Sequence, residues 1–109
     1  MLRAVMCLAI LSVAGAAAAA EPDAKAQGEK VFAGQKCALC HSVAGKGSAK
    51  GPLDEVGTKL SATEIREWIV DAKGMTEKTK SVRKPAMKAY TLPKDDVDAL
   101  VAYLVLLKK

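Results

Sequence analysis

Apolar residues recur at helical spacing in three stretches of the chain, within residues 24–33, 61–73 and 93–109. Positions three and four apart lie on one face of a helix, so each stretch would bury one apolar stripe. The stripes consist of Ala24, Gly28, Val31 and Phe32 in the first, Ile65, Trp68, Ile69 and Ala72 in the second, and Val97, Leu100, Val101, Leu104 and Val105 in the third. No stretch has the period of a strand. The pattern predicts an all-α protein.

Capping residues predict where these helices begin and end. Asp23 is placed to cap the first helix. Ser61 and Glu64 have the spacing of a capping box at the start of the second, and Gly74 is expected to end it. Pro93 begins the third, with acidic residues early and lysines at its end, which suits the helix dipole at both termini.

The two segments between these helices are predicted to be loops. Residues 42–60 hold several glycines and few apolar side chains, and residues 75–91 have no clear period. Gly28 is different, because it lies on the apolar face of a helix, where glycine costs about 1 kcal/mol relative to alanine. Close approach by another element is the expected reason for a glycine there.

Residues 1–20 have the pattern of a secretory signal peptide. Arg3 is followed by an apolar run to Val13 and then by small residues up to Ala20. Cleavage after Ala20 would leave residues 21–109 as one domain. An uncleaved membrane anchor is the alternative, because the apolar run is nearly long enough to span a bilayer. Alanine is only weakly apolar, which argues against an anchor.

The composition limits the core that side chains alone can build. The chain has one Phe, one Trp and two Tyr, and so small a domain is marginally stable without a further apolar group. The formal charge is +5, and removal of Arg3 with the signal peptide leaves +4. A modest basic excess fits an acidic protein partner. Nucleic acid is not an expected partner, because no patch combines aromatic and basic residues.

The segment Cys37-Ala38-Leu39-Cys40-His41 carries the clearest chemistry. Covalent attachment of haem needs two thiols and an adjacent imidazole for the iron. On a helical turn Cys37 lies three residues from Cys40 and four from His41, so all three side chains share one face. We therefore expect one covalently bound haem at Cys37 and Cys40, with His41 as an iron ligand.

Three other interpretations of this segment are open. A zinc site usually needs four Cys or His ligands, but the chain has one His and three Cys, of which Cys7 lies in the predicted signal peptide. A thioredoxin-like redox pair needs a preceding strand and a βαβ context, and neither is visible. A plain disulfide between Cys37 and Cys40 would leave His41 without a role.

Residues 21–109 resemble the class I (monohaem) bacterial cytochromes c over nearly their whole length. In that family the N-terminal helix crosses the C-terminal helix through a glycine and an aromatic residue on the first and a leucine and an aromatic residue on the last. Gly28, Phe32, Leu100 and Tyr103 match these positions. The resemblance implies a small all-α fold in which three to four helices wrap around one haem c.

The resemblance also implies the surroundings of the iron. The family has a proline after the haem motif whose carbonyl accepts a hydrogen bond from the proximal imidazole, and Pro52 matches it. The sixth ligand in the family is a methionine in the loop before the last helix. Met87 fits this position better than Met75, which follows directly after Gly74. One departure is Lys88, where the family often has a proline after the methionine.

The function that the resemblance implies is that of an electron carrier and not of an enzyme. With His41 and Met87 on the iron no site is left for a substrate. The alternatives are a haem subunit of a dedicated oxidoreductase complex and, less favoured because no distal His is visible, a peroxidase or gas-binding protein with an open sixth site. The expected location is the periplasm.

The expected partners are redox proteins with acidic docking surfaces. Lysines and one arginine surround the haem motif and the Met87 loop, namely Lys36, Lys46, Lys50, Lys78, Lys80, Arg83, Lys84 and Lys88. Such a basic rim would steer an acidic surface toward the site. We expect a monomer with no stable membrane insertion once the signal peptide is removed.

Overall fold

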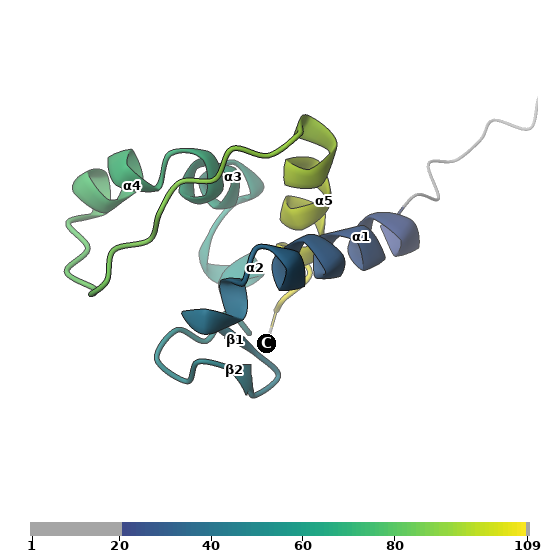
Figure 1. Cartoon of the computed structure of the whole chain (residues 1–109), viewed down its shortest axis with the longest axis horizontal. Coiled ribbons are helices and arrows are strands. Elements are labelled where there is room, and N and C mark those ends of the chain that lie inside the picture. Colours follow the sequence, from purple (N-terminus) through teal and green to yellow (C-terminus); the bar gives the residue numbers. More distant parts are fainter. Residues whose placement is uncertain (1–20, 109) are drawn as a thin grey trace, which may run out of the picture.

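The computed structural model describes residues 21–108, and the predicted signal peptide lies outside this range. The elements are, in chain order, α1 (Glu21–Gly34), the 3₁₀ helix η1 (Cys37–Leu39), β1 (Ser42–Val43), β2 (Lys46–Gly47), α2 (Val56–Lys59), α3 (Ala62–Val70), α4 (Ala72–Thr79) and α5 (Lys94–Leu104). Figure 1 shows α1 lying beside α5, with α3 between α5 and α4. The small all-α fold expected from the sequence is confirmed, with more helical segments than the expected three to four within the described range.

Helices α1 and α5 pack against each other more extensively than any other pair of elements in the described range (Figure 1). Gly28 lies at their closest approach, because a Cβ atom there would overlap the Ala99 carbonyl oxygen and the Tyr103 Cβ. Near this crossing the Phe32 and Tyr103 rings meet edge to face, with centroids 5.9 Å apart. The close approach predicted for Gly28 is therefore confirmed.

The helix expected over residues 61–73 is divided into α3 and α4 by Asp71. The capping box of Ser61 and Glu64 starts α3 as predicted. Asp71 then adopts a non-helical backbone conformation, and its carboxylate accepts a hydrogen bond from the Gly74 N–H, so that a second helix begins. The prediction that Gly74 ends a helix was wrong, since Gly74 lies in the first turn of α4. Residues 75–79 are accordingly helical and not loop.

The segment over residues 42–60 is more ordered than the loop predicted for it. Strands β1 and β2 form a short antiparallel hairpin whose turn, Ala44 and Gly45, has positive φ at both residues. Four further residues form α2. Pairings this short leave no periodic signal in the sequence, which is why the pattern did not show them.

The ends of the long helices differ in part from the prediction. Helix α5 begins at Lys94, directly after Pro93 and close to the predicted start, but it ends at Leu104 and does not reach the terminal lysines. The chain turns there and the Leu107 carbonyl accepts a hydrogen bond from the Gly57 N–H, at 2.9 Å. At the other end α1 begins at Glu21, so Asp23 lies inside the helix and is not its cap.

The segment between α4 and α5 has no regular structure. We call residues 82–92 the strap. Figure 1 shows the strap running back across α3 to reach α5, and the Tyr90 N–H donates to the Ile69 carbonyl of α3 at 2.8 Å. The strap is therefore attached to α3 on its way to α5. Within residues 21–108, no helix combines the length and apolar character that crossing a membrane would require.

Candidate haem site

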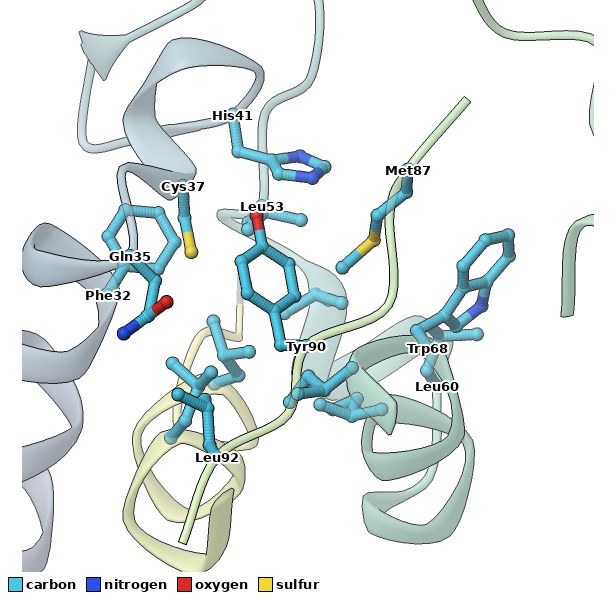
Figure 2. Close-up of a pocket in the computed structure, with 15 residues that line it drawn as sticks. Phe32, Gln35, Cys37, His41, Leu53, Leu60, Trp68, Met87, Tyr90 and Leu92 are labelled. Atoms are coloured by element: carbon cyan, nitrogen blue, oxygen red, sulfur yellow. The ribbon is translucent and has the colours of Figure 1, made fainter. Parts of the chain in front are cut away.

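A cleft lies between α1, α3, α5 and the strap (Figure 2). Most of the side chains that line it are apolar, among them Phe32, Leu53, Leu60, Leu92, Leu100 and Leu104. Cys37, His41 and Met87 also line it. The mostly apolar cleft thus brings together three groups that the sequence analysis singled out: the Cys37 thiol, the His41 imidazole and the Met87 thioether.

The haem motif forms the helical turn that its spacing predicts. The Cys40 and His41 N–H groups both donate to the Cys37 carbonyl, at 3.1 and 2.9 Å. Cys37 is half-buried and Cys40 is exposed, and both are free thiols. Burial raises the pKa of the Cys37 thiol. Figure 2 shows the Cys37 sulfur directed into the cleft.

The hairpin after the motif packs back onto this turn. The Ser48 N–H lies 3.1 Å from the carbonyl oxygens of both Ala38 and His41. Gly47 permits this contact, because its φ is 109° and a Cβ atom there would overlap the His41 carbonyl. The backbone on both sides of His41 is therefore held in place.

The His41 ring is oriented by a backbone carbonyl. Its Nδ1 lies 3.0 Å from the Gly51 carbonyl oxygen, which also accepts the Ser42 N–H at 3.0 Å. Because a carbonyl only accepts, Nδ1 carries the proton, and in the neutral ring Nε2 then keeps its lone pair. The family resemblance implied the carbonyl of Pro52 for this role. The structure places it one residue earlier, because the bridge between Ser42 and Pro52 turns the Gly51 carbonyl toward the ring.

The half-buried imidazole is also biased toward its neutral form. Burial lowers the pKa of His41, the hydrogen bond with Gly51 raises it, and the nearby Arg83 charge lowers it. The net direction is downward. A neutral imidazole with Nε2 free is the form that binds a metal ion.

The two methionines outside the predicted signal peptide lie in different surroundings. Met87, on the strap, lines the cleft, and Figure 2 shows its side chain directed into it from a different element than His41. Met75, on α4, is 4% exposed and does not line this cleft. Of the two candidates, Met87 therefore shares the cleft with His41.

Trp68 and Tyr90 also belong to the cleft. Trp68 is half-buried on α3 and lines the cleft, as does Tyr90 on the strap (Figure 2). The sequence analysis left open whether Trp68 faces the site or the core, and it did not single out Tyr90. Burial raises the pKa of Tyr90. An aromatic residue three positions after the candidate ligand was the signal that could have pointed to it.

The cleft continues outward into a second hollow that charged side chains line. Lys36, Arg83 and Lys88 line it together with Cys40 and Met87. The Lys88 ammonium lies 5.1 Å from the centroid of the Tyr90 ring. Three cations from the motif side and the strap thus lie at the mouth of the site.

The zinc and thioredoxin-like interpretations each require a particular arrangement of residues. Within residues 21–108, no cluster of three or more His, Cys, Asp or Glu side chains is arranged to hold a metal ion. In the same range no strand precedes the motif in a βαβ unit, which a thioredoxin-like pair would need.

The family model of cytochrome c matches residues 25–108. The chain belongs to the cytochrome c family. Comparisons with curated proteins and with solved structures found no match. The family binds covalently attached haem c, so this cytochrome is a haem-containing electron-transfer protein. Its cleft fits that group, since two free thiols, an oriented imidazole with a free Nε2 and a mostly apolar lining are the features that haem c requires.

Proposed function

We propose that this cytochrome is an exported, monohaem c-type cytochrome of class I that carries single electrons between redox proteins. The observation that carries the proposal is that His41 and Met87 enter one mostly apolar cleft from different elements, next to two free thiols. In this proposal it acts as a carrier and not as an enzyme.

Four side chains would hold the cofactor. Cys37 and Cys40 would form the thioether bonds, and His41 and Met87 would bind the iron. When bound, haem c supplies an iron that gains and loses one electron, and the thioether ligand favours the reduced state.

The residues around the cofactor would favour electron transfer over catalysis. The Gly51 carbonyl accepts a hydrogen bond from His41 Nδ1 and so holds the ring in one orientation, which leaves Nε2 available for the iron. Met87 would occupy the position at which a peroxidase or a gas-binding protein admits its substrate. The apolar lining keeps water away, and the helices around it leave little freedom for rearrangement. These features favour rapid gain and loss of one electron over catalysis.

We also propose export to the periplasm with cleavage after Ala20, on the strength of the sequence pattern of residues 1–20. The partners proposed are redox proteins with acidic docking surfaces. Support comes from Lys36, Arg83 and Lys88, which surround the mouth of the site.

Intact-mass measurement tests export and attachment together. Protein purified from the periplasm should have the mass of residues 21–109 plus one haem, and acidic organic solvent should not extract its colour. Cys37→Ser and Cys40→Ser should each sharply lower the yield of holoprotein, because each removes one of the two attachment sites. Release of the haem into the solvent would contradict covalent attachment.

The distal ligand is tested by two methionine variants. Met87→Ala should abolish the weak long-wavelength sulfur-to-iron band of the oxidised protein and lower the reduction potential, because a thioether favours reduced iron. Met75→Ala is the matched control and should leave both properties nearly unchanged, since Met75 is buried on α4 and does not line the cleft. The reverse result would reject Met87 as the ligand.

A further inference from the structure

The strap is held to the rest of the described protein by few polar contacts. Within residues 82–92, two hydrogen bonds reach other elements. One joins the Tyr90 N–H to the Ile69 carbonyl, three residues after Met87. The other runs from the Arg83 guanidinium to the Cys40 carbonyl, four residues before Met87. Met87 therefore lies between two anchors, one on α3 and one on the haem motif.

The Arg83 guanidinium reaches the backbone next to His41. Cys40 directly precedes His41, and the guanidinium also lies against Gly51, whose carbonyl orients the His41 ring. A Cβ atom on Gly51 would overlap both the guanidinium nitrogens and the Cys40 carbonyl. The side chain of Arg83 thus joins the strap to the segment that presents His41.

The neighbours of Arg83 on the strap offer no substitute for this anchor. Val82 is 88% exposed, and Lys84, Pro85 and Ala86 are exposed as well. Without the Arg83 contact, no hydrogen bond among the described residues would join the strap to another element before Tyr90. Ordering such a segment has an entropic cost that grows with the number of residues released.

We infer that Arg83 is a positioning residue for Met87, holding the upstream half of the strap against Cys40 so that the thioether stays in the cleft with His41. This inference rests on the proposed function, because it takes Met87 as the distal ligand. It concerns a residue that makes no bond to the iron and acts through the strap.

Competition with added imidazole tests this role. Imidazole can replace the Met87 sulfur on the oxidised holoprotein when the strap moves away, and loss of the sulfur-to-iron band reports the replacement. Arg83→Met should bind imidazole about tenfold more tightly than the natural protein, because a charge-assisted hydrogen bond no longer holds the strap. Arg83→Lys should fall between the two, since an ammonium keeps the charge and loses the forked geometry.

Lys84→Met is the matched control, because it removes the same charge from the neighbouring strap residue, which has no hydrogen bond or ion pair among the described contacts. Its imidazole affinity should stay near that of the natural protein. Denaturant unfolding of each variant should show similar midpoints, which separates release of the strap from general loss of stability. If Arg83→Met matures poorly, Arg83→Lys and Arg83→Gln give the same comparison.

The outcomes separate the inference from the proposed function. Unchanged imidazole affinity in Arg83→Met would overturn the positioning role, and so would an equal effect of Lys84→Met, which would indicate net charge. If the natural protein lacks the sulfur-to-iron band, or Met87→Ala keeps it, the assignment of Met87 itself fails.

Discussion

Gly28 shows how a single missing side chain decides the geometry of this protein. The atoms that a Cβ there would meet, the Ala99 carbonyl oxygen and the Tyr103 Cβ, belong to the backbone of α5 or lie directly on it. Neither can move without moving the helix. The cleft depends on this crossing, because Phe32 and Leu100, from the same two helices, line it.

We therefore expect Gly28→Ala to destabilise the holoprotein. Forced separation of packed elements typically costs about 1–3 kcal/mol, which exceeds the gain of about 1 kcal/mol from replacing glycine in a helix. Gly34→Ala on the same helix is the control, since nothing lies within 4 Å of its added Cβ. Guanidinium unfolding should show a loss for the first variant and little change for the second, and equal midpoints would show that the crossing can relax.

At the scale of elements, one small network of ion pairs joins α3 to α5. Asp98 on α5 accepts from Arg66 on α3 at 2.6 Å and from Lys94 at 2.7 Å. These hydrogen bonds, first with Lys94 and then with Arg66, lower the pKa of Asp98. All three side chains are partly or largely exposed, so solvent screens the network and its contribution is small.

The sign of this pKa shift predicts a pH dependence. Because the pKa of Asp98 is lower in the folded protein, its stabilisation is present at neutral pH and is lost as the pH falls through the folded-state value. Asp98→Asn should therefore be less stable than the natural protein at neutral pH, and the difference should vanish in acid. Glu77→Gln, which removes a carboxylate without an ion pair among the described residues, serves as control. A difference that persists in acid would indicate a packing effect.

At the scale of the whole molecule, the distribution of charge bears on the proposed partners. The chain carries +5, and Lys36, Arg83 and Lys88 line the hollow at the mouth of the site. Charges gathered at one opening can orient an approaching acidic surface, whereas scattered charges only keep a protein soluble. Salt distinguishes these roles, because screening sets in over about 8 Å at physiological ionic strength.

We expect the bimolecular rate of electron transfer to an acidic redox partner to fall steeply as salt is added. Lys84→Glu combined with Lys88→Glu should lower this rate at low salt and change the reduction potential little. Lys25→Glu combined with Lys59→Glu makes the same change in net charge at two residues that line neither the cleft nor the hollow, and should have a smaller effect. Stopped-flow kinetics give the rates, and a rate independent of salt would argue against steering.

Much of this architecture could be predicted from local sequence signals. The turn of Cys37, Cys40 and His41 follows from their spacing, and the start of α3 follows from its capping box. Such features depend on residues a few positions apart, whose interactions are nearly the same in any fold. The long stripes of α1 and α5 were strong enough to predict two helices, and a glycine within the first stripe indicated close approach by another element. The family resemblance identified that element as the last helix.

The family resemblance predicted features of the iron site that residue spacing alone did not. It pointed to Met87, and the structure places Met87 with His41 in one cleft, but the bond to iron stays a prediction. The expected carbonyl of Pro52 was one residue from the one that the structure shows.

Other features were decided by the tertiary structure alone. The break at Asp71, the choice of the Gly51 carbonyl and the Arg83 anchor had no distinct signal in the sequence. Each depends on which of several possible partners the folded chain brings near: an arginine donates to whichever carbonyl lies within reach, and Cys40 is 43 residues away from Arg83. The sequence determined which residues could do the chemistry, and long-range packing determined which of them meet, because hydrogen bonds and close contacts act over a few ångströms and not along the chain.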